Sequence, residues 1–109
     1  MRMLSVFNHG MFAGLLLEEN PGTGYSFQYD KEYLRQSESK AISITLPLRE
    51  EAYCSDSLFP FFVNMLPEGT NRKLVCRNHK IDEDDDFGLL TFFCGKDFIG
   101  SISFQLAWK

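Results

Sequence analysis

The residues best placed to do chemistry in this 109-residue chain lie in an acidic run, where Asp82, Asp84 and Asp86 occupy alternate positions. This spacing opens the calcium loop of EF-hands, whose sixth position must be Gly and whose twelfth must be a bidentate Glu. The corresponding residues here are Phe87 and Phe93, so the motif is incomplete. We expect a solvated helix N-terminus, where the helix dipole favours carboxylates, with a weak surface cation site as the alternative.

Asp86-Phe87-Gly88 also spells a triplet that binds metal in protein kinases. In a kinase the triplet acts together with a Gly-rich loop, a strand lysine and a catalytic-loop Asp and Asn, and the sequence shows none of these. We therefore predict a helix start with Phe87 packed inward. Gly22-Thr23-Gly24 is not a phosphate loop either, because no Lys-Ser/Thr pair or helix start follows it.

Nucleophilic catalysis requires a Ser, Thr or Cys that is activated by an oriented base. His9 lies in a predicted turn and His79 near a predicted helix end, and neither has an obvious partner in the sequence. The three cysteines, Cys54, Cys76 and Cys94, include no Cys-x-x-Cys pair, which argues against a disulfide framework and a zinc site. We expect no enzymatic activity, no cofactor and no metal.

Five segments show strand patterns, which are short apolar runs or an alternation of apolar and polar residues. Turn residues at Asn8-His9-Gly10 and at Asn20-Pro21-Gly22-Thr23-Gly24 separate the first three strands and predict an antiparallel arrangement. Pro47 is expected to end the fourth strand. The predicted strands cover Met3–Phe7, Phe12–Leu17, Tyr25–Tyr29, Ile42–Leu46 and Ile102–Trp108.

Helical patterns occupy the second half of the chain, and Asp30 is predicted to cap one earlier turn over residues 31–35. The first apolar stripe has the spacing of an amphipathic helix, with Pro60 tolerated in the first turn and Pro67 at the end. It consists of Leu58, Phe61, Phe62, Met65 and Leu66. A second helix is predicted over Glu68–Lys80 with Leu74 and Val75 inward. A third begins in the acidic run and carries Leu89, Leu90 and Phe93.

These elements predict an α+β fold in a single domain over residues 1–109. An antiparallel sheet of about five strands carries two to three helices packed on one face. A chain of this length buries roughly 60 to 70% of its unfolded surface, which is enough for one core.

The formal net charge of −4 argues against direct nucleic-acid binding, which depends on a basic stripe that displaces counterions from phosphates. One basic cluster at helical spacing is balanced by nearby acids and is predicted to be a solvated helix face. It consists of Arg72, Lys73, Arg77 and Lys80. No stretch approaches the ~20 apolar residues of a membrane span, and the N-terminal apolar run is too short for a signal peptide. We expect a cytoplasmic protein.

Two signatures about twenty residues apart are Leu46-Pro47-Leu48-Arg49 and Leu66-Pro67-Glu68-Gly69. Together with Asp86–Leu90 they resemble the small N-terminal subdomain of HipA-type Ser/Thr toxin kinases, and the resemblance covers nearly the whole chain. The sequence stops at Lys109, where the catalytic domain of that family would begin. It therefore resembles the HipS-like antitoxins of bacterial three-gene HipBST systems.

The resemblance implies an antitoxin that binds and neutralises a HipT-like Ser/Thr kinase, alongside a HipB-like DNA-binding protein. In the family this subdomain carries no catalytic residues, and its Pro-Glu-Gly turn faces the kinase lobe. By position, the implied kinase contacts are Phe62, Asn64, Leu66, Pro67, Glu68, Gly69, Thr70 and Asn71. For Phe62 and Leu66, core packing explains the residue type at least as well.

Thr70 follows the Pro-Glu-Gly turn and is small and polar. A bulky plug pushed into the kinase is therefore a poorer fit than restraint of the kinase lobe or occlusion of ATP or substrate. Two other functions stay open. The chain could be an accessory subunit that stabilises or positions a kinase without inhibiting it, or a small unrelated enzyme.

Overall fold

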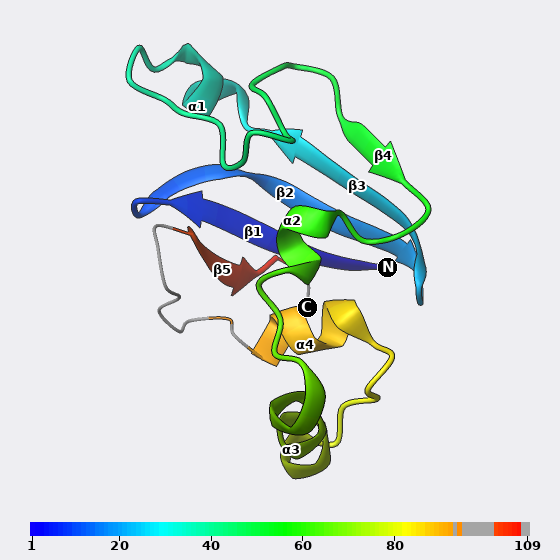
Figure 1. Ribbon diagram of the computed structural model, residues 1–109. Coiled ribbons are helices and arrows are strands. Elements are labelled where there is room, and N and C mark those ends of the chain that lie inside the picture. The colour runs from blue at the N-terminus through cyan, green and yellow to red at the C-terminus, as the bar shows by residue number, and fades with distance from the viewer. Residues whose placement is uncertain (93, 95–101, 108–109) are drawn as a thin grey trace.

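The computed structural model describes residues 1–92, 94 and 102–107. Its strands form one antiparallel sheet in the order β4-β3-β2-β1-β5 (Figure 1). The strands are β1 (Arg2–Asn8), β2 (Met11–Asn20), β3 (Thr23–Tyr29), β4 (Tyr53–Ser55) and β5 (Ile102–Leu106). The described helices are α1 (Lys31–Arg35), α2 (Pro60–Val63), α3 (Gly69–His79) and α4 (Asp86–Phe92). The α+β fold with a five-stranded antiparallel sheet is confirmed.

Turn chemistry explains why the first three strands were predicted correctly. His9 and Gly10 both have positive φ, at 52° and 79°, which is the backbone of the tight hairpin turns that match the strand twist. Gly22, at φ 82°, lies in the turn between β2 and β3. Asp30 then caps α1 as predicted, since its carboxylate accepts hydrogen bonds from the backbone N–H groups of Glu32 and Tyr33.

The predicted strand over Ile42–Leu46 is wrong. This segment makes a single bridge, between Ser43 and Leu46. Ile44 is 97% exposed, although Ile42 and Leu46 on either side of it are buried. The Ser43 hydroxyl accepts a hydrogen bond from the backbone N–H of Thr45 at 3.2 Å, and such local bonds favour a turn over a ladder. The fourth strand is instead β4, which pairs with β3.

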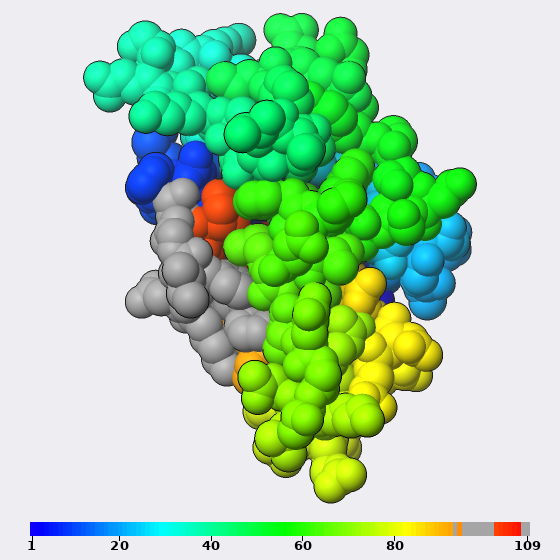
Figure 2. All heavy atoms as spheres, viewed as in Figure 1, coloured from blue at the N-terminus to red at the C-terminus, as the bar shows by residue number. Residues whose placement is uncertain are grey.

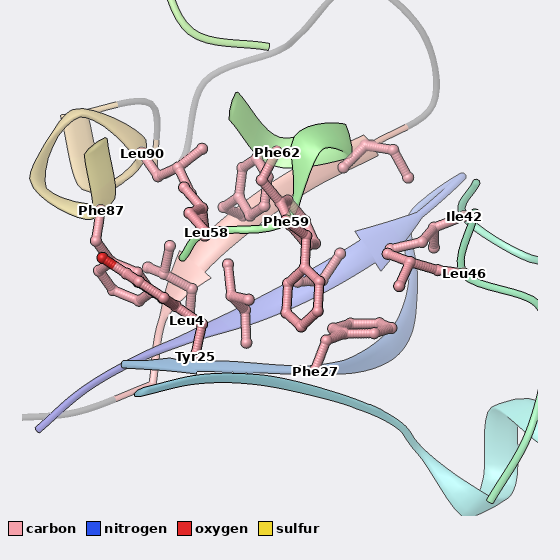
Figure 3. Close-up of a cluster of buried hydrophobic side chains, with 14 of the residues drawn as sticks. Leu4, Tyr25, Phe27, Ile42, Leu46, Leu58, Phe59, Phe62, Phe87 and Leu90 are labelled. Atoms are coloured by element: carbon pink, nitrogen blue, oxygen red, sulfur yellow. The ribbon is translucent and has the colours of Figure 1, made fainter. Parts of the chain in front are cut away.

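The core lies between one face of the sheet and the helices α2 and α4 (Figures 1 and 3). Phe62 is fully buried, and its ring centroid lies 5.9 Å from that of Phe27 and 6.0 Å from that of Phe104. Phe87, the second residue of α4, is fully buried as predicted. Helix α3 lies on the side of α4 away from the sheet (Figure 1).

Two helical predictions need correction. The amphipathic stripe forms only the single-turn helix α2, where Phe59 is the N-cap residue and is itself buried. Leu74 was predicted to face inward but is 50% exposed, and Cys76 is buried instead. The predicted positions of Phe93 and Trp108 lie outside the described residues. None of the described helices is long and apolar enough to cross a membrane.

Candidate functional site

The segment from Asn64 to Asn71, called the α2–α3 connection here, contains most of the residues that the sequence suggested for partner contact. After α2 the chain continues in tight turns, in which Met65 N–H donates to the Phe62 carbonyl at 3.2 Å and Leu66 N–H donates to the Val63 carbonyl at 3.0 Å. Pro67, which lacks an N–H, cannot extend this pattern. The space-filling view shows this stretch and α3 along the surface (Figure 2).

Gly69 fixes the direction in which the connection enters α3. Its φ is +58°, and a β-carbon built there would meet no atom within 4 Å. Glycine is therefore needed for the left-handed backbone and not for lack of space. The preceding residue, Glu68, is the extended N-cap of α3, but its side chain makes no capping hydrogen bond.

Burial divides the eight predicted contact residues into two groups. Phe62 and Leu66 are buried in the core, which favours the core packing that the sequence analysis left open for these two residues. Pro67 is half-buried. The remaining five residues are exposed, and these are Asn64, Glu68, Gly69, Thr70 and Asn71. The connection thus presents a polar, preformed surface with apolar anchors behind it.

Helix α3 is held in place mainly through Arg72. Its guanidinium donates to the carbonyl of Glu83 and pairs with the Asp86 carboxylate at 2.6 Å. The His79 ring packs on Phe92 with centroids 4.4 Å apart. These contacts tie α3 to α4 and to the loop before it, so the orientation of the connection depends on them.

Two residues of the acidic run, Asp85 and Asp86, make ion pairs. Asp85 receives two hydrogen bonds from the Arg2 guanidinium, at 2.8 and 3.1 Å, and one from Gly88 N–H at 3.0 Å. The hydrogen bonds from Arg2 hold the pKa of Asp85 below its usual value. Among the described residues no group of three or more His, Cys, Asp or Glu side chains could hold a metal ion.

Arg2 also reaches Glu18, which is 1% exposed and which the sequence analysis did not single out. The Glu18 carboxylate accepts from Arg2 Nε at 2.7 Å, from the Tyr25 hydroxyl at 2.8 Å and from Gly22 N–H at 3.2 Å. An acidic residue directly after an apolar run was the available signal. The cluster joins three strands to Asp85, the residue before α4, and its groups satisfy one another, which indicates a structural role.

A second surface lies on the sheet face opposite the core. Phe7 and Phe12 pair across β1 and β2 with ring centroids 5.7 Å apart, and Leu15 is 40% exposed. Met3 and Leu17 are partners further along the same two strands. Polar residues of the neighbouring strands flank this apolar stripe, and they are Ser26, Gln28, Ser103 and Gln105.

Comparison with known proteins gives consistent matches. The family model described as HipA N-terminal domain matches residues 4–105. A solved structure titled N-terminal domain of HipA toxin is 31% identical and superposes with a TM-score of 0.73, covering 100% of this chain and 95% of that chain.

Two curated relatives differ in length. A Haemophilus influenzae protein, named only as uncharacterized, is 32% identical over 100 residues, which are 92% of this chain and 88% of that protein. A putative kinase of Sinorhizobium fredii, Y4mE, is 28% identical over 101 residues, which are 93% of this chain but 24% of that protein. A stretch similar to this chain therefore makes up most of the Haemophilus influenzae protein and about a quarter of the Sinorhizobium fredii protein.

Proposed function

The chain belongs to the HipA N-terminal domain family, and from this premise we propose that it is an antitoxin that binds and neutralises a HipT-like Ser/Thr kinase. The observation that carries the proposal is the match over residues 4–105 to a domain that occurs in a HipA toxin. The relative described as a putative kinase contains the same stretch as 24% of its length. The partner that this domain suggests is therefore a kinase. A copy of the domain made as a separate chain would bind the kinase where the N-terminal domain otherwise lies.

The exposed part of the α2–α3 connection is the proposed kinase contact. Pro67 and the left-handed Gly69 fix its backbone in advance, so little conformational entropy is lost on binding. The contact residues are Asn64, Pro67, Glu68, Gly69, Thr70 and Asn71, since Phe62 and Leu66 are buried. Thr70 offers no bulky plug, which favours restraint of the kinase lobe or occlusion of ATP or substrate.

We place a HipB-like DNA-binding protein in the same assembly, with DNA contact made by that protein and not by this chain. The net charge of −4 supports this division, because phosphate binding requires clustered cations. A cytoplasmic location fits the cysteines, all three of which are free thiols.

The test pairs growth rescue with calorimetric binding to a cognate HipT-like kinase that lacks its own N-terminal subdomain. Glu68→Arg combined with Asn71→Arg should weaken binding about tenfold or more and abolish rescue while the melting temperature stays within about 2 °C. Glu38→Arg combined with Ser37→Arg is the matched control, because both residues are exposed in a distant loop. Thr70→Ala should weaken binding by roughly 1 kcal/mol or less.

Each outcome has a distinct meaning. Loss of rescue by Thr70→Ala alone, in a folded protein, would restore the plug mechanism. Tight binding without loss of kinase activity would identify an accessory subunit instead of an inhibitor. Absence of binding by the wild-type chain would contradict the proposed function.

A further inference from the structure

Helix α3 has an inward and an outward face that differ in chemistry. At 100° per residue, Arg72, Cys76 and His79 lie on one side, and all three make the contacts that tie the helix to α4 and the preceding loop. Cys76 is the one buried residue of α3. A helix of eleven residues with a single buried side chain presents most of its surface to its surroundings.

The outward face of α3 consists of Thr70, Lys73, Leu74 and Arg77, all of them exposed. At 100° per residue Leu74 lies at one edge of this face, with half of its surface exposed, and the two basic side chains lie together on one side of it. Within the described part of the chain, neither Lys73 nor Arg77 forms a salt bridge. An apolar side chain beside two cations that form no salt bridge is therefore available to a partner.

The charge of this segment is opposite to that of the chain. Residues 69–80 contain four basic residues and no acidic residue, a formal charge of +4, whereas the whole chain carries −4. Three of these four basic residues lie in α3, and the fourth, Lys80, is its C-cap residue. Arg72 is neutralised by Asp86, which leaves Lys73 and Arg77 as the free cations on the outward face.

We propose that the outward face of α3 docks onto an acidic surface of the kinase that offers an apolar pocket to Leu74. This inference rests on the proposed function and extends its contact surface by two helical turns. Thr70 belongs to both the connection and the outward face, so the two surfaces are continuous. Residues at positions i, i+3, i+4 and i+7 form the row by which helices bind in grooves.

A protein partner is favoured over a nucleic acid by Leu74. A phosphate backbone would pair with Lys73 and Arg77 but would leave the neighbouring Leu74 exposed, whereas a groove buries it. In such an interface the apolar anchor slows dissociation, and the rim charges steer association and give it a salt dependence. The two contributions can be measured separately.

The experiment measures binding of the cognate HipT-like kinase at 0.05, 0.15 and 0.5 M salt, values chosen because screening increases steeply over this range. Lys73→Glu combined with Arg77→Glu should raise Kd about tenfold or more at low salt, and the difference from wild type should shrink at high salt. Leu74→Ser should raise Kd by a similar factor at every salt concentration. Lys31→Glu combined with Lys40→Glu is the charge-matched control and should leave Kd unchanged, because both lysines are exposed away from α3.

The outcomes separate this inference from the function on which it rests. If the wild-type chain binds the kinase and both α3 variants bind equally well with an unchanged melting temperature, the outward face is not a docking surface and the proposed function stands. If the wild-type chain does not bind, both fail. If it binds a 20-base-pair duplex and the Lys73→Glu, Arg77→Glu variant does not, the basic face is a nucleic-acid site and the inference is overturned.

Discussion

Substitution of Phe62 tests whether core packing and kinase recognition are separate within one short stretch of sequence. By position in the family, Phe62 was a predicted kinase contact, yet its side chain is fully buried in this chain. If burial governs its role, changing Phe62 should lower the stability of the fold without altering the affinity of the folded protein for a kinase.

The magnitude follows from the ring contacts. Apart from Phe27 and Phe104, the Phe62 ring meets Phe61 and Phe59, at centroid distances of 5.2 and 6.3 Å. Truncation of a buried Phe to Ala costs about 3–5 kcal/mol, a large part of the roughly 5–15 kcal/mol that stabilises a domain. Replacement by Leu keeps most of the volume and should cost about 1–2 kcal/mol.

Thermal unfolding followed by circular dichroism measures the stability, and titration calorimetry with the kinase at 15 °C measures the affinity. At roughly 4 °C per kcal/mol, Phe62→Ala should melt at least about 12 °C below wild type, and Phe62→Leu about 4–8 °C below. Phe62→Leu should bind the kinase within about threefold of wild type, because the surface of the connection is unchanged. Leu66→Ala, at the other buried position, is the companion variant.

A folded Phe62→Leu variant that binds the kinase more than about tenfold more weakly than wild type would contradict a purely structural role for Phe62. That result would mean that the ring leaves the core to contact the partner. A melting temperature equal to that of wild type would likewise contradict the assigned burial.

Three further predictions concern the backbone, pH and nucleotides. Gly69→Ala should lower the free energy of unfolding by about 1–2 kcal/mol in urea titrations, because an L-residue at φ +58° is strained, whereas Thr70→Ala in the next position should not. Asp85→Asn should destabilise the fold by an amount that is constant above pH 3.8 and shrinks as the pH falls through the lowered pKa of Asp85. The destabilisation shrinks because the wild-type carboxylate becomes protonated and its hydrogen bonds from Arg2 weaken. A difference in stability that persists unchanged to pH 2 would contradict this assignment. Calorimetry with Mg-ATP should detect no micromolar binding, because Asp85 and Asp86 are engaged by arginines; micromolar affinity would show that the acidic run serves another purpose.

The parts of the fold that the sequence predicted are those set by local chemistry. Gly10 and Gly22 supply positive φ at hairpin turns, and Asp30 supplies a capping carboxylate, so the neighbouring elements follow from the residues themselves. The prediction of a strand through Ile44 failed because the alternation of apolar residues is also produced by a turn in which only the outer pair is buried. Periodicity over five residues cannot separate these two structures.

The candidate site was only partly predictable. Pro67 and Gly69 predict a turn, and in the structure Gly69 has the left-handed backbone of a turn, with φ at 58°. Phe62 and Leu66 could not be assigned from the sequence, because a core and an interface both select apolar side chains. Which side of α3 faces inward could not be predicted either, because Leu74 and Val75 are neighbours and point 100° apart around the helix. The pairing of Arg72 with Asp86, which are distant in the sequence, decides which of the two faces outward.

The α2–α3 connection is held between two anchored side chains. Leu66 is anchored in the core on one side of Pro67, and Arg72 anchors α3 on the other side of Gly69. Of the five residues between these anchors Pro67 is half-buried and the other four are exposed, so the side chains of those four add little to the stability of the fold. The proposed contact can therefore change by substitution at Glu68, Thr70 or Asn71 while the fold is preserved, because these exposed side chains contribute little to the roughly 5–15 kcal/mol that stabilises a domain.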